Sequence, residues 1–304
     1  MSRINEIKEE KVVVKTVGEF AGSLQQIAAA RMVKLRKVVL QSRRFVDEAT
    51  IILKELELER TKKIESELTI SKSDVRDFTG KSTKKKTKNP EEKDLATAII
   101  VVTSNQGLSG SYNTDIIRKV ETIIPDHQHA DFFVIGSKGQ AYFRRVAKKY
   151  NVRYYPYNIP ETVGIEDLRP LINMFYHYDQ IYMLYSKYIN TATRDVVFIE
   201  LAVPNIKEVE VKKEQEEGKF IFEPSIEEII RVVTAKLRYS LFRQQILDSK
   251  LSLYTSQMIA MKTASDNAEE LLKDLQLQYN KARRKLIDKK IQEVQAGRSL
   301  WDEE

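Results

Sequence analysis

The stretch YTSQMIAMKTASDNAEELLKDLQLQYNKARRKL, residues 254–286, decides the fold, because its apolar and small residues recur at alternating spacings of four and three. An alternation held over four heptads is typical of one strand of a left-handed coiled coil. The surrounding residues 225–296 contain neither Gly nor Pro, which predicts a helix of ~108 Å if it is unbroken. The predicted seam consists of Tyr254, Met258, Met261, Ser265, Ala268, Leu272, Leu275, Tyr279, Ala282 and Leu286.

The N-terminal segment has a seam of its own, with the same spacing. It consists of Leu24, Ala28, Arg31, Leu35, Val38, Ser42, Phe45, Ala49, Ile52 and Leu56. Two long helices at opposite ends of one chain, each with a seam, most simply pair with each other. The middle of the chain connects them, so we expect an antiparallel pair, and small residues in both seams allow a close approach.

The middle of the chain alternates between strand and helix patterns. Strands are predicted at 95–103, 131–135, 151–157, 180–185 and 195–203, helices at 114–124, 140–150 and 165–177, and a hairpin from 209–213 and 219–222. This order indicates a parallel sheet with helices on its faces. The predicted class is therefore α/β, an antiparallel coiled coil of long N- and C-terminal helices plus a Rossmann-like parallel-sheet domain. The expected parts are residues 1–79 (N-terminal coiled-coil helix), 80–94 (basic linker), 95–223 (Rossmann-like foot domain) and 224–304 (C-terminal coiled-coil helix and tip).

The loop TSNQGLSGSYN, 103–113, follows the first strand and precedes a helix, as many phosphate-binding loops do. Its two glycines, Gly107 and Gly110, do not make G-x-G-x-x-G, and the Walker string is absent. The second strand also ends in a glycine turn, GSKG, 136–139, so glycine serves tight backbone geometry at both places. A nucleotide-binding α/β enzyme with coiled-coil arms nevertheless remains an alternative on these residues.

Composition excludes several other kinds of site. The chain has 304 residues and no Cys, so it has neither a thiolate nucleophile nor a Cys zinc site, and it lacks the G-x-S-x-G elbow. No apolar run is long enough to span a membrane. The net charge is +7, and the one dense basic run, KSTKKKTK at 81–88, has no interleaved aromatics and reads as a solvated loop rather than a nucleic-acid site. We expect no catalytic residue, no metal and no cofactor.

Five motifs resemble the gamma subunit of F-type ATP synthases, in the right order along nearly the whole chain. IAAARM (27–32) resembles V-A-A-S-K-M, TSNQGLSGSYN (103–113) resembles T-S-D-[RK]-G-L-[CA]-G-[GA]-[LY]-N, and IGSKG (135–139) resembles I-G-x-K-G. MIAMKTASDNA (258–268) and LQLQYNKAR (275–283) resemble M-x-A-M-x-x-A-[ST]-x-N-A and L-x-L-x-Y-N-[RK]-A-R, and this C-terminal run is the most specific part.

The resemblance implies a rotor without catalysis of its own. In the family the coiled coil stands inside a hexamer of alpha and beta subunits, and the foot meets the epsilon subunit and the membrane c-ring. The resemblance implies one copy of the chain per complex and no nucleic-acid partner. It also implies a peripheral location on the cytoplasmic side of the cell membrane. The contact with the beta subunits is implied for Arg31, Lys34, Arg283, Arg284 and Asp288, and the foot motif for Gly107, Gly110, Asn113, Gly136 and Gly139.

The chain departs from the family pattern near its C-terminus. Where the family has R-Q-A-x-I-T-x-E, this chain has RRKLIDKK, 283–290, so Arg284 replaces a glutamine and Lys290 a glutamate. SLYTSQM, 252–258, replaces S-E-x-x-A-R-M. These departures motivate an alternative, a gamma paralogue in a specialised F-like ATPase motor that does not synthesise ATP.

Overall fold

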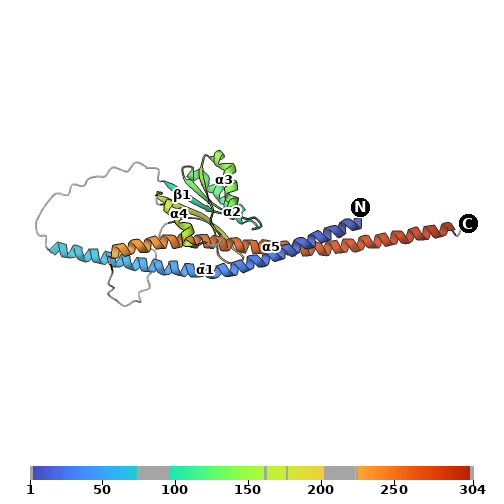
Figure 1. Ribbon diagram of the computed structural model, residues 1–304, viewed down its shortest axis with the longest axis horizontal. Coiled ribbons are helices and arrows are strands. Elements are labelled where there is room, and N and C mark those ends of the chain that lie inside the picture. Colours follow the sequence, from blue (N-terminus) through green and yellow to red (C-terminus); the bar gives the residue numbers. More distant parts are fainter. Residues whose placement is uncertain are drawn as a thin grey trace. The chain divides into compact units, whose positions relative to one another are not determined.

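The computed structural model describes residues 3–73, 96–160, 163–175, 177–201, 223 and 225–301. The chain divides into two compact units. The first consists of Met1–Val33, Leu108–Gly110 and Tyr254–Glu304, and the second of Lys34–Gly107 and Ser111–Leu253. Two long helices, α1 (Arg3–Ser73) and α5 (Ile226–Trp301), contribute residues to both units (Figure 1).

In the first unit, α1 and α5 form an antiparallel pair, as the seams predict. A Cβ atom on Gly18 would lie 3.0 Å from the Cβ of Ala268, and one on Gly22 would lie 3.7 Å from Ser265 Oγ. Further along α1, the guanidinium of Arg31 lies 5.7 Å from the ring centre of Tyr254. Partner numbers fall on α5 as they rise on α1, which defines the antiparallel direction.

The seam of α1 differs by one residue from the prediction in the second unit. Phe45 and Ile52 were placed in the seam, but they are 52% and 50% exposed, whereas Val46 and Leu53 are 6% and 1% exposed. The buried pair packs with Leu56 against Ile226, Ile230 and Leu237 of α5. The predicted and the observed seam both alternate spacings of four and three, and they share every second position. Because positions 45, 46, 52 and 53 are all apolar, the sequence is compatible with either seam.

The second unit contains a five-stranded sheet in the order β3-β2-β1-β4-β5. The strands are β1 (Thr97–Val102), β2 (Asp131–Ile135), β3 (Arg153–Tyr157), β4 (Gln180–Tyr188) and β5 (Arg194–Glu200). The first four pair in parallel, with Ile100 opposite both Phe133 and Met183. Strands β1 and β2 are buried almost completely, which explains their continuous apolar runs.

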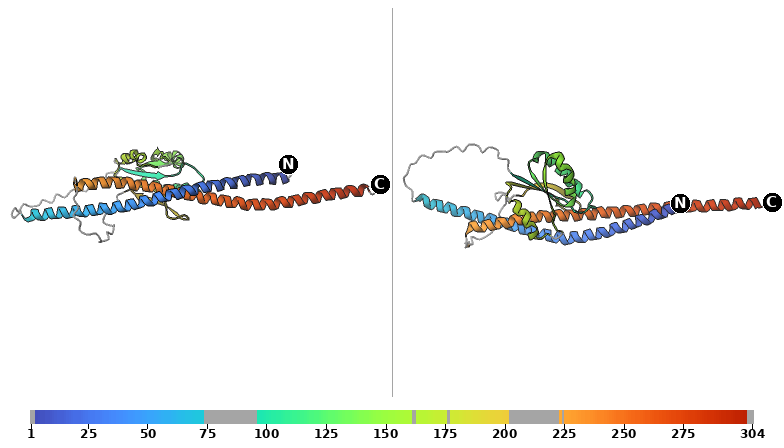
Figure 2. Two further views of the ribbon diagram at one scale, coloured as in Figure 1. Left: turned by 60° about the horizontal axis from the view of Figure 1, so that its bottom comes forward. Right: turned by 45° about the horizontal axis from the view of Figure 1, so that its top comes forward.

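Helices cover both faces of this sheet (Figures 1 and 2). One core lies beneath α2 (Tyr112–Ile123) and α3 (Ser137–Tyr150), with the short 3-10 helix η1 (Ile124–His127) following α2. The other core lies beneath α4 (Ile165–Phe175) and α5, which contributes Phe242 and Ile246. The second unit is therefore a three-layer α/β/α arrangement in which a terminal helix forms part of one layer.

Two details differ from the predicted fold. Strand β5 is antiparallel to β4, because residues 189–193 are too short for the crossover that a parallel pair needs. Helix α3 begins at Ser137, so Gly139 lies in its first turn rather than in a preceding loop. The predicted hairpin at 209–222 and the basic run at 81–88 lie outside the described residues.

Candidate functional site

The crevice at the carboxyl ends of β1 and β4 is where an open α/β sheet with this strand order usually holds a ligand. Helix α5 lies against it. Ser252 Oγ of α5 is 2.7 Å from Ser186 Oγ of β4, and Ser249 Oγ is 2.7 Å from the hydroxyl of Tyr112. All four side chains are buried. A helix of the chain itself therefore occupies this position.

Tyr112 anchors that packing as a neutral hydroxyl. Burial raises its pKa to about 12, which outweighs the lowering by the hydrogen bond with Ser249 and by the charge of Arg194. The Arg194 side chain also approaches the Tyr112 ring, at 5.8 Å, and pairs with Asp115 at 2.5 Å. These contacts join α2, β5 and α5 around the base of the loop at 103–113.

The predicted foot-motif glycines bring two turns together. Gly136 has φ 96°, and a Cβ there would lie 2.3 Å from the carbonyl oxygen of Thr103. A Cβ on Gly139 would lie 2.7 Å from Thr103 Oγ1, which accepts the Gly139 N–H at 2.9 Å and donates to the carbonyl of Ile135 at 2.8 Å. Gly136 thus permits a close backbone contact between the ends of β1 and β2, and Gly139 lets the first turn of α3 approach the side chain of Thr103.

The remaining foot-motif residues shape the loop after β1. The side chain of Asn113 accepts the Ser104 N–H at 3.0 Å. Gly110 has φ 55° and faces Ala260 of α5, whose Cβ would lie 3.6 Å from an added Cβ. Gly107 has only the end of the Lys138 side chain nearby, at 3.9 Å. Leu108, with φ 61° and 61% exposure, is the strained residue at the tip.

An ion pair that the sequence analysis missed joins α1 to α5 in the second unit. The guanidinium of Arg43 lies 2.8 Å from Asp248 Oδ1 and also donates to the carbonyl of Tyr188. The Asp248 side chain is only 4% exposed, and burial raises its pKa above the usual 3.8 despite the nearby Arg43 charge. An acid and a base far apart in sequence, each among many surface charges, left no signal for this pairing.

The predicted contact residues are exposed, and they form two groups. Arg31 and Lys34 lie on α1, with Arg31 beside Tyr254. Arg283, Arg284 and Asp288 lie on α5, 29 or more positions beyond Tyr254, which corresponds to ~43 Å of helix. Each group is solvent-accessible, but the structure does not bring the two groups together.

The second group belongs to a strongly basic stretch. Residues 281–290 contain six Lys or Arg and one Asp. In the described part of the chain, neither Arg283 nor Arg284 forms an ion pair. Their guanidinium groups are therefore available for the bidentate contacts that arginine makes with carboxylates.

Most of the other predicted seam residues lie inward, but Arg31 and Leu286 are exposed. Ala28, Met261, Ala268 and Leu275 are buried, and Leu24, Leu35, Met258, Leu272 and Tyr279 are half-buried. Gly18 and Gly22 were missed as seam residues, although their spacing of four and their small partners on α5 are a recognisable signal of close helix packing.

Two kinds of feature are absent from the described residues. No cluster of His, Asp or Glu among them could hold a metal ion. No helix in the described ranges is long and apolar enough to cross a membrane.

Comparison with known proteins gives consistent results. A family model described as ATP synthase matches residues 3–299. The ATP synthase gamma chain of Ligilactobacillus salivarius (strain UCC118) is 31% identical over 221 residues, covering 68% of this chain and 71% of that protein. The ATP synthase gamma chain of Streptococcus pyogenes serotype M49 (strain NZ131) is 28% identical and covers 97% of both chains.

Solved structures share the fold. A chain from the mitochondrial ATP synthase of Euglena gracilis (OSCP/F1/c-ring, rotational state 3) has a TM-score of 0.60 at 16% identity, covering 97% of this chain and 93% of that one. A chain from the central stalk and c-ring of the Tetrahymena thermophila enzyme has a TM-score of 0.55 at 19% identity, covering 81% and 99%. Together with the family match over almost the whole length, these findings show that the chain belongs to the ATP synthase gamma-chain family.

Proposed function

We propose that this chain is the central shaft of an F-type ATP synthase or ATPase, turning inside a hexamer of alpha and beta subunits. The observation that carries the proposal is the antiparallel pairing of α1 and α5 within the first unit. A unit built of two helices buries little of its outer surface, and Val13, Val17 and Phe20 of α1 are 54–61% exposed. Such a surface suits a shaft that its partners enclose.

The chain acts without a catalytic site. As a gamma-family subunit it is a non-catalytic part of the assembly, and ATP chemistry belongs to the beta subunits. Helix α5 supports this assignment, because its Ser252 and Ser249 pack against Ser186 of β4 and Tyr112 of α2. We therefore propose no nucleotide-using activity for this chain by itself.

Coupling rests on differential contact. A shaft with different side chains on different faces stabilises different conformations of the surrounding subunits as it turns, which shifts their populations. We assign the contacts with the beta subunits to Arg31 and Lys34 at one level and to Arg283, Arg284 and Asp288 at another. Their exposure and the charge of residues 281–290 support this assignment.

The α/β unit is the proposed foot of the shaft. The Tetrahymena and Euglena structures named above contain c-rings, and we infer that the foot of this chain meets a c-ring and an epsilon subunit. We further propose that each complex holds one copy of the chain, peripheral to the membrane and on its cytoplasmic face. The parts 1–79, 80–94, 95–223 and 224–304 stay as proposed boundaries.

A second candidate is a related motor that hydrolyses ATP without synthesising it. The altered segment 283–290 favours it, since its extra cations change the proposed contact with the beta subunits. Reconstituted vesicles distinguish the two. ATP synthesis driven by an ion gradient would exclude the hydrolysis-only motor.

The proposal predicts what a tagged copy recovers from its own cell's membranes. Native mass spectrometry should show a hexamer of alpha and beta subunits with one copy of this chain, and the isolated chain should not hydrolyse ATP. Recovery of the chain alone or as a homodimer would contradict the shaft proposal.

A further inference from the structure

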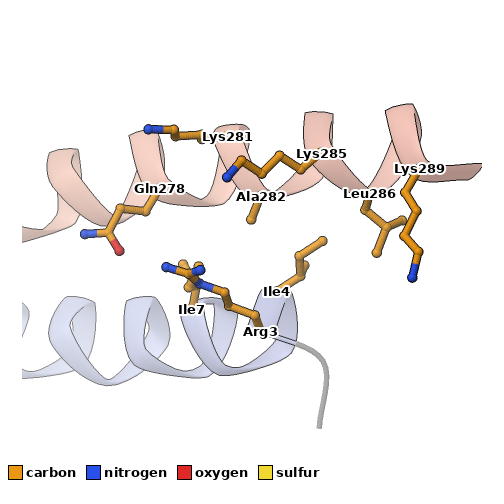
Figure 3. Close-up of a pocket in the computed structure, with 9 residues that line it drawn as sticks. All are labelled: Arg3, Ile4, Ile7, Gln278, Lys281, Ala282, Lys285, Leu286 and Lys289. Atoms are coloured by element: carbon orange, nitrogen blue, oxygen red, sulfur yellow. The ribbon is translucent and has the colours of Figure 1, made fainter.

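Each of the two units contains a pocket on its own surface. In the first unit, a cleft of about 440 Å³ lies between α1 and α5, and Arg3, Lys281, Lys285 and Lys289 line it (Figure 3). Three of these cations belong to the stretch 281–290, whose proposed role is contact with the beta subunits. In the second unit, a separate pocket of about 200 Å³ is formed by α1, α5 and the turn between β4 and β5. We call it the turn pocket.

The turn pocket is lined by two arginines of α1, Arg36 and Arg43. Residues seven apart on a helix lie on one face, about two turns or ~10.5 Å from each other. No Asp or Glu lines the pocket. Arg36 is exposed, and it forms no ion pair with another described residue. The pocket therefore has a positive charge that its own lining does not balance.

Arg43 is fixed in position and still has unused donors. It donates to Asp248 Oδ1 at 2.8 Å and to the carbonyl of Tyr188 at 3.3 Å, and both hydrogen bonds come from Nη2. In the part of the chain that the structure describes, Nη1 and Nε of Arg43 make no hydrogen bond. The second guanidinium of the pocket is thus held in place by the fold without being fully occupied.

The turn after β4 adds a further donor. Asn190 lines the pocket, and its Oδ1 accepts the N–H groups of Ala192 at 2.9 Å and Thr193 at 2.8 Å. Its side-chain NH2 group donates no hydrogen bond to the described residues. The polar part of the lining therefore offers donors, and the oxygen atoms of an anion are the acceptors that match them.

The rest of the lining is apolar. Leu40 lies between the two arginines along the same face of α1, and it is 48% exposed. Ile189, from the turn, is 55% exposed, whereas Val39 and Leu251 are buried. An inorganic anion would leave Leu40 and Ile189 in contact with water. A ligand that matches the whole pocket carries an apolar group as well as an anionic one.

The size of the turn pocket limits the ligand further. A volume of 200 Å³ equals that of about seven water molecules at ~30 Å³ each. Sites for drug-sized ligands occupy roughly 300–1,000 Å³, so a nucleotide is too large to be enclosed here. The pocket suits an anion with a body no larger than a single small ring or a short carbon chain.

We propose that the turn pocket binds a small organic oxyanion, in which a carboxylate or phosphate group is attached to a compact apolar body. Guanidinium groups pair with either head group through two parallel hydrogen bonds, and the apolar body lies against Leu40 and Ile189. A bound ligand would join α1 to the turn between β4 and β5. The proposal does not depend on rotation, because every lining residue belongs to the second unit.

Ligand-observed NMR on the full chain tests the inference, with saturation transfer from the protein to two probes. Benzoate and phenyl phosphate carry the two head groups on the same ring, so binding of one probe rather than the other identifies the head group. We expect at least one to bind, and Arg36→Ala to weaken its binding by about 10- to 100-fold, the range for hydrogen bonds to a charged group. Arg44→Ala is the matched control, because Arg44 is an exposed arginine of α1 that does not line the pocket.

A second variant tests the apolar part of the site. Ile189→Ala keeps every charge and should also weaken binding of the ring probes, and unchanged affinity would overturn the organic character of the ligand. The site itself would be overturned if neither probe bound the parent chain. Equal losses in Arg36→Ala and Arg44→Ala would overturn it too, because they would reflect only the general positive charge of α1. None of these results bears on the shaft proposal, which fails only if no hexamer is recovered with the chain.

Discussion

At the residue scale, the close contact between Gly139 and Thr103 gives the most direct test of the loop's structural role. A methyl group at Gly139 would lie 2.7 Å from Thr103 Oγ1 and 2.9 Å from the side chain of Val134. We expect Gly139→Ala to lower the free energy of unfolding by about 1–3 kcal/mol, the usual cost of overpacking. Chemical denaturation of the full chain measures this change.

Gly107→Ala is the matched control. It lies in the motif 103–113, which begins at Thr103, but its nearest side-chain atoms, at 3.9 Å, belong to the flexible end of Lys138. Equal losses in the two variants would show that the loop does not depend on the contact with Thr103.

The Arg43–Asp248 pair predicts a second residue-scale effect. Arg43→Ala would leave Asp248 buried without its partner, a change that costs ~3–5 kcal/mol for fully buried pairs. The cost should fall at or below the lower end, because the Arg43 side chain is 32% exposed and solvent screens part of the interaction. Urea denaturation gives the value.

The same variant should change the dependence of stability on pH. Since the pKa of folded Asp248 is raised above 3.8, the folded protein holds this proton more tightly than the unfolded chain does. The contribution of Asp248 therefore falls as pH rises from below 3.8 through the folded pKa. Removing Arg43 raises that pKa further and should deepen the fall.

The double variant Arg43→Ala/Asp248→Asn is the control for the pH effect. It has no carboxylate at position 248, so the added pH dependence should disappear. A constant difference in stability between Arg43→Ala and the parent across the acid range would contradict this explanation.

At the element scale, two leucines on α5 test which positions of the helix face the seam and which face the solvent. Leu275 is 2% exposed and Leu277 is 67% exposed. We expect Leu275→Lys to destabilise the coiled coil by about 2–5 kcal/mol, because it would bury an unpaired charge or open the helix pair. Leu277→Lys should change the thermal transition little, and similar shifts in both variants would refute the observed register.

The sequence predicted these elements well where one pattern excluded the others. Apolar runs in β1 and β2 and the Gly- and Pro-free stretch of α5 each allow one interpretation. The predicted seam of α1 was wrong at this point because Phe45 and Val46 are both apolar, and only tertiary packing determines which of them is buried. The direction of β5 could have been predicted from the short connection after β4.

The sequence also predicted only part of the candidate site. The glycines of the loop and the basic residues of 281–290 are visible in the sequence. The Arg43–Asp248 pair and the cleft lined by Arg3, Lys281 and Lys285 depend on which residues of α1 meet α5, and that information exists only in the folded chain. Arg3 lines this cleft only because α5 lies beside it in the folded chain.

At the scale of the whole molecule, the proposed contacts predict a loss of coupling. We expect Arg283→Ala and Arg284→Ala to lower ATP-driven torque or ATP synthesis in the assembled complex and to leave the fold intact, because both side chains are exposed. Lys273→Ala is the control, as this lysine pairs with Glu269 along the same helix at 3.1 Å. Parent-like coupling in both arginine variants would show that the beta-subunit contact lies elsewhere.

The central claim, that this chain rotates as a shaft, is tested most directly by watching it turn. The chain has no cysteine, so Lys148→Cys on the exposed end of α3 gives a single attachment point for an optical probe. With the hexamer fixed to a surface, the account predicts that the probe rotates continuously in one direction when ATP is supplied and stops when it is removed. A probe that stays still in a complex that hydrolyses ATP would contradict the account.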